Sequence, residues 1–335
     1  MVVMKKIAAI VLFFSALSLR AQDSPRRLVE LGFDLGIPYT GSYRGALDVF
    51  KDVVTPDWSD MVFDLDNRLG AFFNIHESAY LNFNLGVNFK IGLFTGINSI
   101  GQFKIPPSVD LDHGSASFLE AGLWFSTRIR RWTLTVRPSY FLPLVYVNET
   151  EIYTPLPLAP SGDTDLLSML RKGGLDLSLR GEYPLFRNLL IGGTITHIPL
   201  LTAELKDTYS RGVSGTGNKV LFRPFKLGVN AVYRPFYKWL FTLKPEVALV
   251  FNTIYDTPVS VYGDFALTGE FNLREVVILD LGTHYEDLTW KQRAALTLNF
   301  RALELTIGIS TQSPQFIETF QGVGFGIDLG VRVGY

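Results

Sequence analysis

The C-terminal stretch of the chain, Val323 to Tyr335, alternates without interruption between two kinds of side chain. Every odd position is apolar, and every even position is glycine, aspartate or arginine. Because successive side chains of a β-strand point to opposite faces, this stretch predicts a strand with one apolar and one polar or small face. In a soluble protein such a free edge would promote aggregation, whereas closure into a membrane barrel removes it. The terminus therefore indicates a transmembrane β-barrel.

Apolar residues recur with a period of two in most of the chain from Arg27 onward, for example in 81–91 and 132–142. We expect about fourteen strands, an even number that leaves both termini on the periplasmic side. They are predicted near 27–37, 61–75, 79–92, 116–129, 132–146, 173–183, 188–199, 219–234, 238–252, 259–271, 274–285, 288–300, 302–310 and 321–335.

The predicted connections alternate between short and long, as in bacterial barrels with short periplasmic turns and long extracellular loops. Short turns are expected near 130–131, 184–188, 235–238, 273–274 and 301–302. Longer loops are expected at 38–60, 93–115, 148–171, 200–217 and 311–320. Aromatic residues gather beside the short turns, where a girdle at the membrane surface is expected. The predicted fold class is therefore all-β, a closed antiparallel transmembrane barrel.

The N-terminus has the features of a secretory signal peptide. Lys5 and Lys6 precede an apolar core at 7–17, and Ala21 is a small residue suited to cleavage. The alternative is an uncleaved membrane anchor. We expect a signal peptide at 1–21, a single barrel domain at 22–335 and a location in the bacterial outer membrane. Hydrophobic residues make up 47% of the chain, yet no later apolar run approaches the ~20 residues of a membrane helix.

Composition argues against several classes of function. The net charge of −1 gives no field that favours nucleic acid, and the absence of cysteine excludes disulfides and thiolate metal sites. Four scattered histidines give no zinc spacing, and no glycine-rich phosphate loop opens a helix. We expect no metal and no cofactor.

Two groups of residues contain side chains of the types used in catalysis. His76-Glu77-Ser78 contains an acid, a base and a hydroxyl, but it is predicted to lie in a periplasmic turn, where adjacent side chains point apart. Asp280 and His284 share one strand face and could act as a general base, but the sequence places no nucleophile beside them. We therefore predict no enzyme and no catalytic residue.

The parity of the strands places nearly balanced charges inside the barrel, which favours an ion-pair network over a strongly ion-selective pore. The residues predicted to line the lumen are Arg137, Arg180, Asp264, Asp280, His284, Lys291 and Arg293.

The predicted outer loops are unusually apolar, with a proline-rich stretch at 153–160 and a short helix at 164–171. These loops either fold over the barrel mouth as a plug or contact a hydrophobic solute. The residues expected to make such contacts are Leu156, Leu158, Leu166, Leu167, Met169, Leu170, Ile198 and Leu200.

The strand count, the apolar loops and the stretch NLLIGGTITHIP at 188–199 resemble FadL-type barrels. These include the transporters of long-chain fatty acids and aromatic hydrocarbons, and uncharacterised spirochaete and Bacteroidetes relatives. The resemblance implies transport of hydrophobic compounds. FadL-type transporters carry an N-terminal plug inside the barrel, but only about five residues separate Gln22 from the first predicted strand, so we expect no such plug here.

These observations give two main functional hypotheses, and Asp280 and His284 alone motivate a third, a barrel enzyme that acts on lipid. The first is a porin-like outer-membrane channel or transporter for small, hydrophobic solutes. The second is a non-conducting surface barrel whose loops bind host or envelope partners. Expected partners are outer-membrane lipid, a hydrophobic small molecule, and the barrel-assembly machinery, because the strand that ends at Tyr335 resembles its C-terminal recognition signal.

Overall fold

A computed structural model describes most of the chain. The described residues are 28–40, 71–85, 88–104, 112–148, 151–154, 170–210, 213–235, 240–251, 261–273, 276–286, 289–300, 302–313, 315–321 and 324–334. Among these residues no helix is long and apolar enough to cross a membrane. The predicted signal peptide and most of the predicted 148–171 loop lie outside the described residues.

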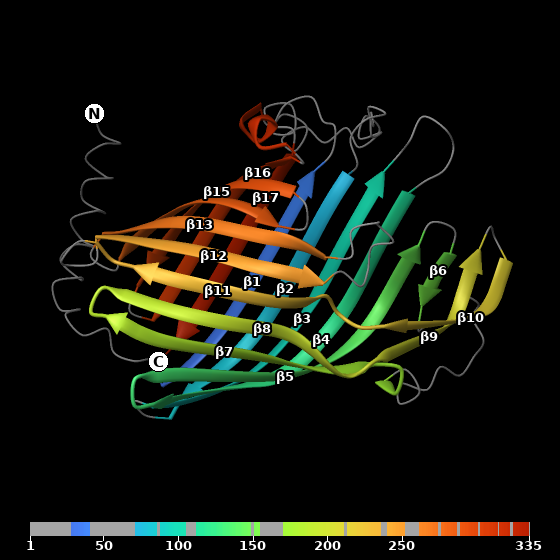
Figure 1. Ribbon diagram of the computed structural model, residues 1–335, viewed down its shortest axis with the longest axis horizontal. Helices are drawn as coiled ribbons and strands as arrows, with labels where there is room; N and C mark the ends of the chain where they lie inside the picture. The colour runs from blue at the N-terminus through green and yellow to red at the C-terminus, as the bar shows by residue number, and fades with distance from the viewer. Residues whose placement is uncertain are drawn as a thin grey trace.

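Fourteen antiparallel strands form the wall of a closed barrel (Figure 1). They are β1 (Val29–Thr40), β2 (Ala71–Asn84), β3 (Phe89–Lys104), β4 (Asp112–Ile129), β5 (Trp132–Asn148), β7 (Gly174–Phe186), β8 (Leu189–Leu201), β11 (Phe225–Tyr233), β12 (Phe241–Phe251), β13 (Val261–Leu273), β14 (Val277–Glu286), β15 (Thr289–Asn299), β16 (Leu303–Ser313) and β17 (Gly324–Gly334). The predicted fold class is confirmed.

The barrel closes where the first wall strand pairs with the last. β1 and β17 are in antiparallel register from Glu30–Gly334 to Thr40–Gly324, and β1 also pairs with β2. The chain skips twice along the wall, because β5 pairs with β7 and β8 pairs with β11. Closure gives every wall strand two neighbours, so the backbone needs no water within the bilayer.

The two faces of the wall have opposite chemistry. Outward side chains are apolar and exposed on nearly every strand, as Leu31, Leu281 and Val331 illustrate. Aromatic pairs flank this apolar belt. Trp132–Tyr183 and Phe241–Phe271 lie beside the short turns, and Phe225–Phe251 and Tyr285–Trp290 lie toward the other end. This pattern is that of a lipid-facing belt between two aromatic girdles.

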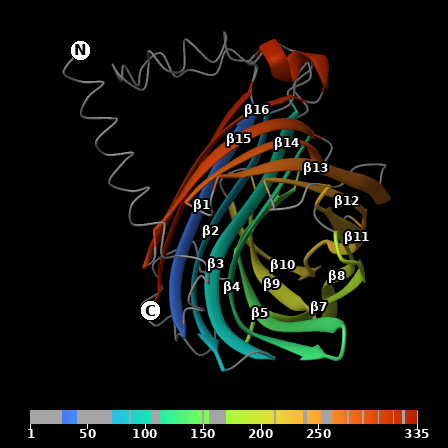
Figure 2. The ribbon, with the colours of Figure 1, turned by 90° about the vertical axis from the view of Figure 1, so that its left-hand side faces the viewer.

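Three further strands extend the sheet beyond the wall: β6 (Glu151–Thr154), β9 (Ala203–Ser210) and β10 (Val213–Leu221). β9 pairs with both β6 and β10, and Figure 1 shows these three strands together at one end of the barrel, whose ring of wall strands is seen in Figure 2. A buried apolar cluster joins this extension to β4 and β5. Its members are Ala116, Phe118, Phe141, Tyr146, Ala203, Leu205 and Leu221.

The predicted turn at His76-Glu77-Ser78 is wrong, because these residues lie in the middle of β2. The real connection is at 85–88, where the Leu85 amide donates to the Phe89 carbonyl (3.0 Å). The apolar alternation continues through this connection, so the sequence predicts a single strand over 79–92. The predicted loop at 93–115 likewise contains the end of β3 and the start of β4.

A second difference concerns the region around Pro224. The sequence predicted one strand over 219–234, but β10 ends at Leu221 and β11 begins at Phe225. Proline has no amide hydrogen and cannot complete a strand ladder, which fits the break at 222–224. The predicted 200–217 loop contains β9 and the start of β10.

The outward face of β17 gives the first testable prediction. Leu329 faces outward between Leu35 and Ile307, so Leu329→Arg should impair folding by up to ~2–4 kcal/mol, the cost of an arginine facing lipid near the bilayer midplane. The matched control is Thr306→Arg on the inner face of the adjacent strand, which should fold almost normally. Heat-modifiable mobility after folding into vesicles measures the difference, and equal folding of the two variants would contradict the assigned faces.

Candidate functional site in the barrel lumen

A cavity of about 490 Å³ lies inside the barrel. Its wall comes from β2, β3, β4, β5, β7 and β8, with contributions from Arg223 and from Arg332 of β17. The volume falls in the ~300–1,000 Å³ range that is typical of small-molecule sites. This cavity is the candidate functional site.

Three aromatic side chains line one side of the cavity: Tyr80, Phe94 and Trp124. Their neighbours across the strands are glycines, and a Cβ at Gly32 or Gly92 would overlap the ring of Tyr80 or Trp124. The missing Cβ therefore lets each ring lie over the adjacent strand. The result is an aromatic wall in a lumen whose other inward-facing side chains are mostly polar.

Polar contacts hold two of these rings, those of Trp124 and Phe94, in place. Trp124 Nε1 donates to Asn82 Oδ1 (2.9 Å), and Asn82 Nδ2 donates to Glu30 Oε1 (3.4 Å). The Arg137 guanidinium carbon lies 3.7 Å from the centroid of the Phe94 ring, a cation–π contact. The aromatic wall is thus pre-organised before any solute arrives.

Arg223 is the centre of a buried ionic network beside the cavity. Its side chain is only 3% exposed, and its Nε and Nη2 donate to Asp176 (2.6 and 2.8 Å). Nη2 also donates to Ser139 Oγ (2.7 Å), and Nη1 donates to Glu120. Arg137 pairs with the other oxygen of Glu120 (3.0 Å). Two arginines and two carboxylates neutralise one another and tie residue 223 to the inner wall.

His197 marks an irregular point in the wall. It has a positive φ of 56° and lies where the β7–β8 register shifts. Its amide donates to the Ser178 hydroxyl (3.1 Å), and its Nδ1 lies 2.9 Å from the Pro224 carbonyl oxygen. As a consequence, the adjacent residues Thr196 and His197 both line the cavity, which a regular strand does not permit.

The structure divides the residues predicted to line the lumen into two groups. Arg137 and Arg180 line this cavity, and Arg180 pairs with Glu182 on its own strand (2.6 Å). The other five lie on β13, β14 and β15, away from it. Asp264 pairs with Lys226 (2.8 Å), and Arg293 pairs with Asp328 (2.6 Å).

The remaining members of that second group are Asp280, His284 and Lys291. His284 Nδ1 lies 3.7 Å from Glu286 Oε1, so its charged partner is Glu286 rather than Asp280. Asp280 Oδ1 and His284 Nε2 are buried without a hydrogen-bond partner among the described residues. Lys291 pairs in register with His284. Among the described residues, Asp280 and His284 therefore do not form an acid–base pair with each other.

Most of the predicted apolar loop contacts lie outside the described residues, namely Leu156, Leu158, Leu166, Leu167 and Met169. Leu170 and Leu200 are exposed, and Ile198 is half-buried in β8. The hypothesis of a loop plug therefore stays a prediction.

Sequence reasoning missed the residues that define the cavity. Tyr80 and Trp124 lie in predicted strands on the inward face, but the predicted lumen residues are charged or titratable side chains and include no aromatic residue. Phe94 lies in the predicted 93–115 loop, which carries no strand parity. Arg223 was missed because the region was predicted as one continuous strand, although the adjacent Pro224 could have indicated the break.

Comparison with known proteins supports the fold. No protein-family model matches the chain, and no curated protein matches its sequence. Among solved structures, a FadL homologue from Pseudomonas aeruginosa matches with a TM-score of 0.58 and 10% identity, covering 92% of this chain and 90% of that one. The chain has the fold of a FadL-type barrel.

Two further FadL-fold structures are similar over nearly their full length. The toluene transporter TodX of P. putida has a TM-score of 0.53 and 10% identity, over 95% of this chain and 92% of TodX. The monoaromatic hydrocarbon channel CymD has a TM-score of 0.52 and 9% identity, over 93% and 89%. At this level of identity the likeness establishes the architecture, and the resemblance predicted from sequence is confirmed at that level.

The buried network gives the second prediction. Arg223→Met should destabilise the barrel by ~3–5 kcal/mol, because Asp176 would keep a buried charge without its cation and Glu120 would keep only Arg137 as a partner. Arg180→Met is the control, since its ion pair with Glu182 is half-exposed and contributes less than ~1 kcal/mol. Urea unfolding in vesicles measures both. Similar losses of unfolding free energy in the two variants would show that Arg223 is not the structural centre of the buried ionic network.

Proposed function

We propose that the protein is an outer-membrane channel that passes small hydrophobic solutes, with compact aromatic compounds as the preferred class. The observation that carries the proposal is the aromatic cavity formed by Tyr80, Phe94 and Trp124 inside a lipid-facing barrel. Planar aromatic solutes stack well on such rings. The FadL-type solved structures named for toluene and monoaromatic hydrocarbons support this choice of solute.

The charges around the cavity also suit a neutral solute. Arg223, Arg137, Glu120 and Asp176 pair with one another, so a neutral solute can pass without competing for a free ion. An ion-selective pore would instead present an excess of one sign. Arg332, which also lines the cavity, pairs with Glu304, and elsewhere on the inner wall Arg293 pairs with Asp328.

The third prediction tests passage through this cavity. The probe is radiolabelled toluene, supplied to Gram-negative cells whose own hydrophobic-compound channels have been deleted. Expression of the protein should raise the uptake rate. Thr135→Trp, which fills the cavity next to Trp124, should lower this gain about tenfold, equivalent to a barrier of ~1.4 kcal/mol.

The matched control is Thr268→Trp, an inward position on β13 that does not line the cavity. It should leave uptake unchanged. Equal uptake with and without the protein would refute a transport role. It would then favour the alternative, a non-conducting surface barrel, if the same cells gained binding to host or envelope components.

A further inference from the structure

The arginines around the aromatic cavity are more accessible from it than their acidic partners are. The lining includes Arg137, Arg180, Arg223 and Arg332 but, among the described residues, no aspartate or glutamate. Apart from Arg223, these arginine side chains are 41% to 50% exposed, whereas the glutamates that they bond are 14% to 22% exposed. Each ion pair is neutral as a unit, but its hydrogen-bond donors face the cavity.

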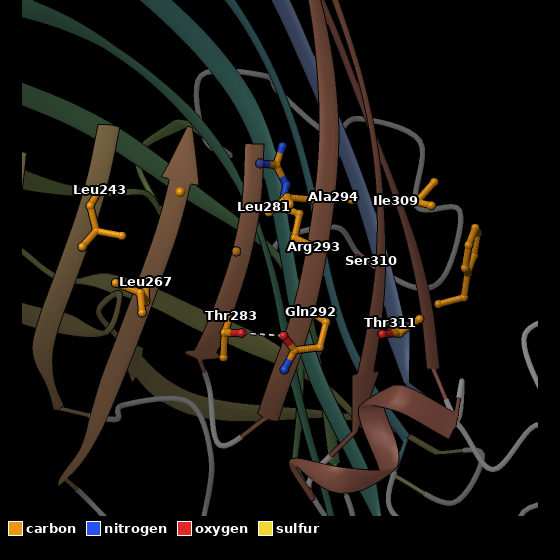
Figure 3. A pocket seen from close by; sticks show the side chains of 13 residues that line it. Leu243, Leu267, Leu281, Thr283, Gln292, Arg293, Ala294, Ile309, Ser310 and Thr311 are labelled. Carbon is orange, nitrogen blue, oxygen red and sulfur yellow. Dashed lines mark hydrogen bonds between the residues drawn. The ribbon is translucent and has the colours of Figure 1, made fainter. Parts of the chain in front are cut away.

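This concentration of arginines distinguishes the cavity from a second hollow in the wall. That hollow, of about 690 Å³, lies over β12 to β17 and is lined in part by Leu281 and Ile309, which are exposed (Figure 3). Its lining contains one arginine among the described residues, Arg293, whose Nε donates to Asp328 (2.6 Å). Donors that could bind a solute are therefore gathered in the aromatic cavity and not in this second hollow.

Arg180 is the arginine of the cavity that is most available to a solute. The Arg223 side chain is buried, and the Arg137 guanidinium lies over the Phe94 ring. Arg332 lies near two acidic side chains from neighbouring strands. The side chain of Arg180 is half-exposed, and its one acidic partner in an ion pair is on its own strand.

Arg180 also keeps donors that its ion pair does not use. Its Nε and Nη2 bond the same oxygen of Glu182, at 2.8 and 2.6 Å. A guanidinium has five N–H donors, so those on Nη1 remain outside this pair. Thr135 on β5 and Thr194 on β8 flank Arg180 in register, and both line the cavity. Thr135, Arg180 and Thr194 together form a polar corner.

The polar corner lies beside the aromatic wall. On β4, Trp124 is two residues from Ser126, which pairs in register with Thr135 and accepts a hydrogen bond from its hydroxyl (3.1 Å). Two residues of a strand span ~7 Å. A compound with one aromatic ring and one oxygen substituent can therefore contact both surfaces at once.

We propose that the cavity prefers neutral aromatic compounds that carry one acceptor oxygen, such as aryl ketones and aldehydes, over plain aromatic hydrocarbons. The ring stacks on Trp124 and Phe94, and the carbonyl oxygen accepts a charge-assisted hydrogen bond from Arg180. This preference rests on the proposed channel function and defines its substrate class more closely. The preferred compound is neutral, because each arginine of the cavity already pairs with a carboxylate.

The test compares acetophenone with α-methylstyrene, which has the same shape but a CH2 group in place of the carbonyl oxygen. Isothermal titration calorimetry measures the binding of each compound to the full-length protein in lipid nanodiscs, with empty nanodiscs as the blank. The wild type should bind acetophenone at least about tenfold more tightly. Arg180→Met should weaken acetophenone binding about tenfold and α-methylstyrene binding by less than about threefold.

The matched control is Lys244→Met, which removes an inward cation from a similarly exposed ion pair, that with Glu270, outside the cavity. This variant should bind both compounds as the wild type does. Heat-modifiable mobility confirms that each variant is folded. The comparison of the two compounds on the wild type keeps the test decisive if Arg180→Met does not fold.

Equal affinities of the wild type for the two compounds would overturn the proposal, and so would equal effects of the two substitutions. Tighter binding of benzoate than of acetophenone would overturn it too, because the site would then recognise an anion. Toluene uptake by the wild type tests the channel separately. If uptake occurs without the preference for the ketone, only this inference fails. If the preference occurs without uptake, the binding site stands and the channel function fails.

Discussion

Closure of the backbone hydrogen-bond ring between β1 and β17 is the constraint on which the rest of the structure depends. Within a bilayer no water can satisfy an open sheet edge, so fourteen wall strands must each find two partners. Closure fixes the register of every strand, and register fixes which side chains meet lipid. Leu329 and Val331 therefore face outward, while Asp328 and Arg332 are inside and pair with Arg293 and Glu304.

The inward charges then have to neutralise one another. Arg223 is the clearest example of this pairing. It lies in the 222–224 break, enters the lumen and pairs with the acidic residues of β4 and β7. The same break brings the Pro224 carbonyl to His197, at the bulge of β8. Ionic pairing, the chain break and the bulge thus belong to one local arrangement, and the aromatic cavity lies beside it.

Much of the fold could be predicted from the sequence, because alternation with a period of two indicates which side chains of a barrel face lipid and how many strands it has. Prediction from this alternation failed at 85–88, where the alternation continues through a turn. It also failed inside β2, where a run of polar residues resembles a turn. The cavity was harder to predict, because Tyr80, Phe94 and Trp124 meet only through inter-strand register. Arg223 reaches Glu120 across 103 residues, a pairing that no local pattern contains.

The most direct test of the account is a cross-link across the closing seam. The chain contains no cysteine, so Glu30→Cys with Gly334→Cys introduces the only two thiols, on residues that are partners in the β1–β17 register. Oxidation in intact outer membranes should join them in high yield. Glu30→Cys with Asn272→Cys, on β13, should not cross-link. Failure of the first pair, or equal yields from both, would contradict the closed fourteen-strand barrel.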